Sequence, residues 1–220
     1  MNLPPRLLYL SLFLLIHPLT DTAALDLADG QFPVQSNLRA GAAKVDITPA
    51  ETEGVWVTGH RRQVHGVRDP LRAGVLVLDD GETKAAIITL DTIGAWEELV
   101  KPVREQIEKE TGIPAANILI TASHNHSAPG FVENLKWGAE LIAKLVATAK
   151  KAAAELRPVS VGYGEEKISF GINRRKVVDG RAVVSLNPDG PNDPRVKVLR
   201  FDDGQSLTPV AVLMHAVCHP

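Results

Sequence analysis

Short apolar runs interrupted by Asp-Gly turns make up much of this chain. An Asp-Gly pair between two runs of apolar, β-branched residues is the strongest short-range signal for a β-hairpin. Three segments have this form: residues 73–91, 176–184 and 195–217. An earlier run, residues 40–49, alternates Val45 and Ile47 with polar residues and ends at Pro49. The pattern therefore predicts one early strand and three hairpins.

Two longer segments have the apolar spacing of an α-helix. In the first, residues 95–112, apolar positions are four apart and Gly112 suits a helix C-cap. The second, residues 133–158, stops at Pro158 and carries lysines opposite its apolar stripe. The predicted buried positions are Leu99, Val103 and Ile107 in the first helix, and Leu135, Ala139, Ile142, Leu145, Val146 and Ala149 in the second. We interpret the basic face as a solvated surface.

The order of these elements predicts the fold class. A strand at residues 117–122 lies between the two helices, and another at 159–164 follows the second helix. We expect these two strands to be parallel neighbours joined by a right-handed crossover. Together with the hairpins, this gives an α/β fold: a layered, mixed β-sheet with several β-hairpins and two long helices in a β-α-β unit. Sites in such folds form beyond the carboxyl ends of the strands.

Composition narrows the class of partner. The 220 residues carry 24 Lys and Arg against 26 Asp and Glu, so no basic excess favours nucleic acid.

Cys218 is the single cysteine, which excludes an internal disulfide. We expect it to be a small buried apolar residue.

The N-terminus is typical of an exported protein. Arg6 precedes an apolar stretch over residues 7–16, and small residues follow at 22–24. This pattern predicts a signal peptide over residues 1–24, and secretion or periplasmic localisation. An uncleaved lipid anchor is the alternative. Residues 25–39 are expected to form a mobile lead-in to a domain at 40–220.

Histidines supply the candidate chemistry. Six of the seven fall into three pairs: His60 and His65, His124 and His126, and His215 and His219. His124 and His126 follow the predicted strand 117–122, and positions i and i+2 of an extended chain face the same side. They could share a metal site or move protons. The alternative is a loop stabilised by hydrogen bonds of the two rings.

Strand geometry predicts different roles for His215 and His219. Residues four apart on a strand are about 13 Å apart, so His215 and His219 cannot bind one ion. His219, at the strand exit, is the better ligand, and His215 a core or supporting residue. Catalytic zinc usually has three protein ligands. Asp91, His60 and His65 are candidates for completing the set, and the spacing does not choose among them.

Other catalytic motifs are missing from the sequence. It contains no G-x-S-x-G elbow, no G-x-x-x-x-G-K-[ST] loop and no C-x-x-C pair. Ser127 stands beside His126, but its place in a turn favours a structural role over that of a nucleophile.

Several stretches together resemble the N-terminal domain of the neutral/alkaline, non-lysosomal ceramidase family. They run in family order from about residue 40: "AGAAKVDITP", "LRAGVLVLDDG", "ITASHNHSAPG", "GINRR" and "VAVLMHAVCHP". The H-x-H-S-x-P-G element is the most specific of them. The chain reads Ser123, Asn125 and Ala128 where ceramidases have Thr, Thr and Gly, and Arg175-Lys176 where they have Ser-Pro.

The resemblance implies roles for five residues. His124 and His219 would be zinc ligands, and His126 would act beside the metal on a proton or on the substrate. Asn173 and Arg174 match the family's Asn-Arg element and would bind substrate, with the Arg174 guanidinium also steadying charge during catalysis.

The implied activity is zinc-dependent hydrolysis of a linear amide bond, as in N-acylsphingosine or a related lipid amide. The implied partners are a lipid substrate and the surface of a membrane. Two alternatives stay open: a non-catalytic exported binding domain, and a metal-dependent esterase or lactonase. The family's other two zinc ligands, a glutamate and a tyrosine, lie downstream of the second histidine, so we expect a domain that is incomplete at its C-terminus and not competent for hydrolysis by itself.

Overall fold

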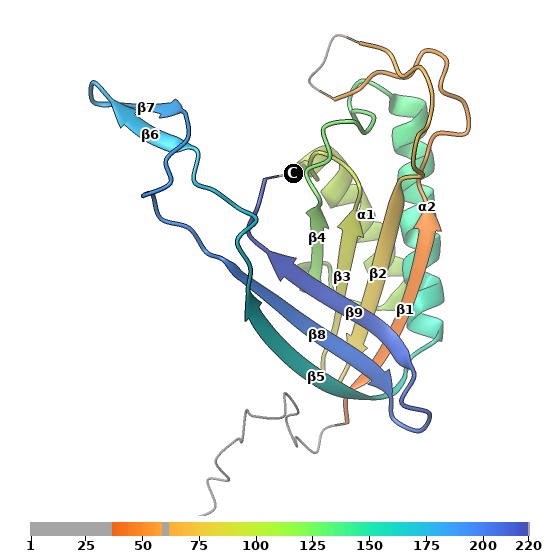
Figure 1. Ribbon diagram of the computed structural model, residues 1–220. Coiled ribbons are helices and arrows are strands. Elements are labelled where there is room, and N and C mark those ends of the chain that lie inside the picture. The colour runs from red at the N-terminus through yellow and green to blue at the C-terminus, as the bar shows by residue number, and fades with distance from the viewer. Residues whose placement is uncertain (1–36, 59–61, 220) are drawn as a thin grey trace, which may run out of the picture.

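The computed structural model of this chain describes residues 37–58 and 62–219 and shows a mixed seven-stranded sheet with two helices (Figure 1). The strand order is β4-β3-β2-β1-β5-β8-β9, and β6 and β7 form a separate pair. The predicted signal peptide and His60 lie outside the described residues. The strands are β1 (Arg39–Asp46), β2 (Arg72–Asp79), β3 (Lys84–Leu90), β4 (Ile118–Ala122), β5 (Arg157–Lys167), β6 (Arg175–Val178), β7 (Arg181–Val184), β8 (Arg195–Asp203) and β9 (Pro209–Ala216).

All three predicted hairpins are confirmed as antiparallel pairs: β2 with β3, β6 with β7, and β8 with β9. The turn between β6 and β7 shows why the Asp-Gly signal is reliable. Asp179 and Gly180 both have positive φ, 50° and 74°, as a two-residue hairpin turn requires. Gly180 adopts this conformation without a steric penalty.

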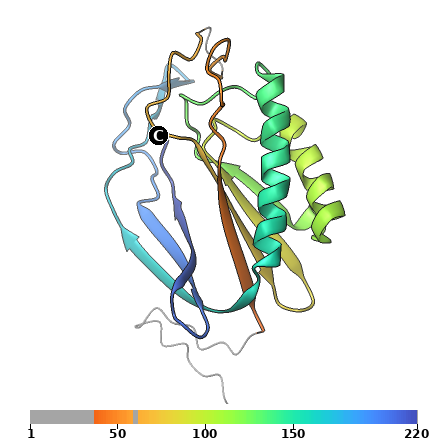
Figure 2. The ribbon, with the colours of Figure 1, turned by 90° about the vertical axis from the view of Figure 1, so that its right-hand side faces the viewer.

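The helices α1 (Glu97–Thr111) and α2 (Leu135–Ala154) cover one face of strands β1 to β4 (Figure 2). The first matches its prediction, because Leu99, Val103 and Ile107 are buried and Gly112 caps the helix in the left-handed conformation. Among the described residues, no helix is long and apolar enough to cross a membrane.

The stripe predicted for the second helix is wrong in its first half. Leu135 is 72% exposed, and the buried positions there are Trp137, Gly138 and Leu141. The indole of Trp137 donates a hydrogen bond to the carbonyl oxygen of Ile47, 2.8 Å away, which turns this side of the helix toward the sheet. Leu145, Val146 and Ala149 are buried as predicted.

The β-α-β unit exists, but its strands differ from those predicted. The parallel neighbours are β3 and β4, joined through α1 and the short 3-10 helix η2 (Ala115–Asn117). The prediction that residues 117–122 and 159–164 are neighbours is wrong, because β4 is an edge strand and β5 pairs with β1 and β8. The second helix therefore carries the chain across the sheet.

The sheet bends at β5. A second, smaller core joins Ala40 and Leu76 on the face away from the helices to Phe201 of β8. Strands β5, β8 and β9 consequently lie over this face, opposite the helices (Figure 2). The bend brings the ends of the two edge strands, β4 and β9, toward each other.

Candidate metal site

His124 lies at a sharp change of direction two residues after β4. Backbone hydrogen bonds hold both of its neighbours, from Ser123 N to Leu90 O at 2.9 Å and from Asn125 N to Thr92 O at 3.1 Å. Between them, His124 has a φ of 62°, a conformation that is costly for a residue with a side chain. Strain of this kind persists only where the surroundings impose it, and it occurs often at functional sites.

The ring of His124 is oriented by the backbone behind it. Its Nδ1 lies 2.7 Å from the carbonyl oxygen of Ile93, and a carbonyl can only accept, so Nδ1 carries the proton and donates it. In the neutral ring Nε2 is then the free donor of a lone pair. Histidines that bind metals commonly use one nitrogen in this way while the other nitrogen is held by a carbonyl.

His126 reaches the same place by a turn. The amide of Ser127 donates to Asn125 Oδ1 at 2.8 Å, which closes a tight turn, so Ser127 lies in a turn as the sequence predicted. The expected extended chain from His124 to His126 is therefore wrong. The ring centroids are nonetheless only 4.8 Å apart, because the left-handed residue and the turn together bring the rings to one side.

The loop after His126 is fastened to another part of the chain. Ala128 O accepts from Thr58 N, and Gly130 N donates to Trp56 O. The buried side chain of Asn134 adds bonds to Trp56 N, Trp56 O and Gly130 O. These bonds fix the loop whose first residues are the two histidines.

His219 approaches from the opposite edge of the sheet. It follows the end of β9 by three residues, and its ring centroid lies 4.8 Å from that of His124 and 5.1 Å from that of His126. The other histidine of the pair, His215, lies within β9 opposite Lys197 and is exposed, which contradicts a place in the core. As strand geometry predicted, only one of the two joins the group.

The three rings suit a zinc ion. One nitrogen from each of His124, His126 and His219 lies within 4.8 Å of the other two, and all three side chains are exposed. Two nitrogens bound to one zinc at about 2.1 Å can be at most about 4.2 Å apart, so small ring movements would complete direct contact. Imidazole nitrogen is a preferred donor for zinc. His65 and Asp91 are not in this group, which is the only such cluster in the described part of the chain.

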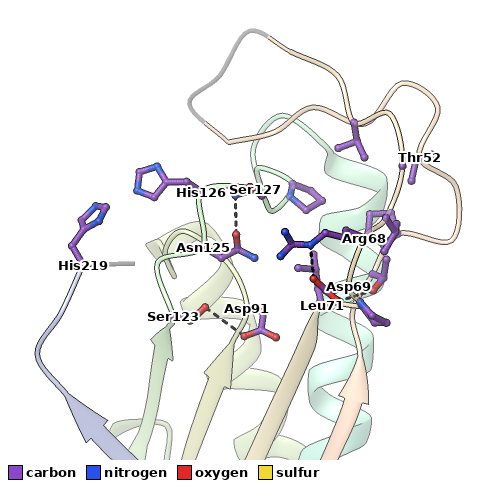
Figure 3. A pocket seen from close by; sticks show the side chains of 17 residues that line it. Thr52, Arg68, Asp69, Leu71, Asp91, Ser123, Asn125, His126, Ser127 and His219 are labelled. Carbon is purple, nitrogen blue, oxygen red and sulfur yellow. Dashed lines mark hydrogen bonds and ion pairs between the residues drawn. The ribbon is translucent and has the colours of Figure 1, made fainter. Parts of the chain in front are cut away.

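A pocket of about 830 Å³ opens beside His126 and His219 (Figure 3). Asp91 lies at its base, where its carboxylate accepts hydrogen bonds from Arg72 N and Ser123 Oγ. Arg68 and Asp69 form an ion pair across the pocket from His126 and His219. Sequence reasoning missed this pair, since nothing in the spacing connects the segment around Pro70 with the histidines.

A second hollow, about 760 Å³, lies on the other side of His124 and His219. Asn173 and Arg174 line it. The amide of Asn173 is occupied at both ends, since Nδ2 donates to Pro191 O and Oδ1 accepts from Arg175 N. Cys218 also lines the hollow and is exposed, so its predicted burial is wrong.

An ion pair stiffens the wall of this second hollow. The guanidinium of Arg195 donates two hydrogen bonds of 2.8 Å to the carboxylate of Asp193. These bonds, together with one from the Arg195 amide, hold the pKa of Asp193 far below its ordinary value of 3.8. Asp193 is therefore ionised throughout the neutral range.

Comparison with known proteins places the fold. No family model matches the sequence, and no curated protein matches it. Solved structures do match, among them a ceramidase complexed with C2, at 21% identity and a TM-score of 0.67, and the neutral ceramidase from Pseudomonas aeruginosa, at 20% and 0.66. They cover 81% and 82% of this chain. The chain spans 31% and 32% of theirs. The fold is thus ceramidase-like, as the motifs predicted, over about a third of such a protein.

Proposed function

We propose that this chain is the metal-binding, N-terminal part of a ceramidase-like hydrolase that cleaves a linear amide bond in a lipid such as an N-acylsphingosine. The observation that carries the proposal is the meeting of His124, His126 and His219, delivered from opposite edges of a ceramidase-like sheet. A loop stabilised by its own histidines would not require His219, which comes from a distant strand.

In this proposal His124 and His219 hold a zinc ion. The backbone carbonyl of Ile93 fixes the ring of His124 so that Nε2 is available. Bound zinc supplies Lewis acidity and lowers the pKa of a coordinated water to about 7. Among the described residues, the 4.8 Å cluster contains only imidazoles.

His126 is the proposed proton carrier. Its ring is close enough to the other two to reach groups at the metal, and its turn is anchored by Asn125 and the backbone around Trp56. An amide does not break until its nitrogen is protonated, so a residue that gives a proton to the leaving amine is required. Such general acid–base help contributes about 10²- to 10⁴-fold in rate.

Arg174 is the proposed contact for the polar part of the substrate. It lines the hollow beside His124 and His219, and a guanidinium there would orient a carbonyl or hydroxyl and stabilise developing negative charge. Asn173 contributes to substrate binding by fixing the backbone that carries Arg174, because its own amide is engaged by Pro191 and Arg175.

The test uses the complete natural protein loaded with zinc, assayed on an N-acyl lipid amide and on the matched ester. We expect amide hydrolysis, and a rate about 10²- to 10⁴-fold lower in His126→Ala with its zinc retained. His215→Ala is the matched control, because this exposed histidine lies on the same strand as the approach to His219 but outside the cluster. Hydrolysis of the ester alone would reassign the protein as an esterase. Tight zinc binding with neither activity would make it a binding domain.

A further inference from the structure

The hairpin of β6 and β7 stands apart from the rest of the sheet (Figure 1). We call residues 174–184 the arm. Every residue of the two strands is exposed, and among the described residues the strands pair only with each other. At its root, Asn187 Nδ2 donates to Arg175 O, and Asn187 N donates to Asn173 O. The arm is therefore fastened at its base and free along its length.

The arm concentrates positive charge on a protein that has none in excess. It contains four cations and one carboxylate, whereas the whole chain has a net charge of −2. No carboxylate in the described part of the chain forms an ion pair with these cations. The cations are Arg174, Arg175, Lys176 and Arg181, and the carboxylate is that of Asp179.

The strand register sorts the remaining side chains onto two faces. Cross-strand partners share a face, so Val177, Ala182 and Val184 lie on one side with Arg175. Val177 and Val184 are 71% and 72% exposed. The other side carries two cations, Lys176 and Arg181, with two valines. One face is thus mainly apolar and the other is half basic.

We propose that the arm docks this protein onto an anionic lipid surface. Cations attract acidic headgroups, and the valines of the apolar face gain by entering the boundary between headgroups and acyl chains. An acidic protein segment would satisfy the cations, but its charged side chains would not give the exposed valines an apolar environment. The proposal does not depend on hydrolysis. Because Asn173 and Arg174 line the hollow beside the histidines, docking would bring the candidate site to the lipid.

The experiment is vesicle co-sedimentation of the 220-residue chain. Phosphatidylcholine vesicles with about 30% phosphatidylglycerol should bind it, neutral vesicles should bind it weakly, and added salt should weaken binding. Arg175→Gln/Lys176→Gln/Arg181→Gln should bind about 100-fold less tightly, given roughly a five-fold contribution from each cation near such a surface. Lys109→Gln/Lys136→Gln/Lys151→Gln, which removes the same charge from exposed helix positions, should bind like the original chain.

A second variant tests the apolar face. Val177→Ser/Val184→Ser keeps all cations and should still bind several-fold less tightly, with unchanged salt dependence. Equal losses in the arm and helix charge variants would overturn the proposal, since binding would then follow net charge alone. Absence of vesicle binding together with binding to soluble polyglutamate would overturn it in favour of an acidic protein partner. Because no turnover is measured, failure here leaves the proposed hydrolysis standing.

Discussion

The Nδ1 atom of His124 donates to the carbonyl oxygen of Ile93 at 2.7 Å, so the backbone of one loop determines the chemistry of a side chain on another. We predict that neutral His124 keeps its proton on Nδ1, whereas a free imidazole in water has no such constraint. Nitrogen NMR shifts of the metal-free chain would report this tautomer. A His124 with the proton on Nε2 would mean that the carbonyl does not hold the ring.

Substitution of the clustered histidines His124 and His219 should lower zinc affinity, whereas substitution of His215 should not. Loss of a residue that merely orients a ligand costs about 10- to 100-fold in affinity, so His124→Ala and His219→Ala should each cost more than about 100-fold. His215→Ala should change it little, because this residue lies outside the cluster. Competition titration with a chelating dye measures all three. A large loss in His215→Ala alone would place the site elsewhere.

Gly41 of β1 should be intolerant of a side chain. A Cβ built there would lie 2.1 Å from the carbonyl oxygen of Ala152, near the end of the second helix, and backbone cannot move aside cheaply. We expect Gly41→Ala to lower the free energy of unfolding by about 1 to 3 kcal/mol, the range for overpacking. Chemical denaturation provides the measurement.

Gly164→Ala is the matched control, since it also replaces a strand glycine but meets nothing within 4 Å. If the two variants were equally stable, the close approach of the second helix to β1 would be wrong.

The features predicted from sequence are those encoded locally. Asp179-Gly180 fixes its hairpin through two backbone angles, and Gly112 ends its helix in the same manner. The order of strands in the sheet is not encoded locally, because nothing between residues 122 and 159 indicates which strand β5 will pair with. The buried side of the second helix depends on Trp137 meeting Ile47, ninety positions away.

In the candidate site, too, the locally encoded features were predicted from sequence and those that depend on distant contacts were not. The H-x-H motif and the histidine after an apolar strand were visible in sequence because each follows a recognisable strand. The turn that carries His126, the support from Ile93 and the pocket beside Arg68 were not visible. Each depends on a backbone atom or on a loop brought near by the fold.

Stability at low pH should depend on Asp193. Because its folded-state pKa lies below the ordinary 3.8, its contribution is complete above pH 3.8 and is lost as the pH falls through the lowered value. Asp193→Asn should therefore melt at a lower temperature than the original chain at pH 7. The gap should narrow below pH 3.8. Thermal melts over this range test it, and a gap that widened toward acid would reverse the sign.

Export predicts a defined new N-terminus. Since Arg6 and its apolar stretch precede small residues, cleavage is expected near Ala24 or Leu25. N-terminal sequencing of protein recovered from outside the cytoplasm measures this directly. Recovery of a chain that still begins at Met1 would support an anchored leader instead.

The bend of the sheet would let a bound metal ion stabilise both of its edge strands. The strands β4 and β9 are the two edges of one sheet. An ion shared by His124 and His219 would therefore be a cross-link between the ends of these two edge strands. In chain-entropy terms, a cross-link over roughly a hundred residues is worth up to about 4 to 5 kcal/mol. Removing the ion should therefore loosen both edges together, and amide exchange should quicken in two strands that are not paired with each other.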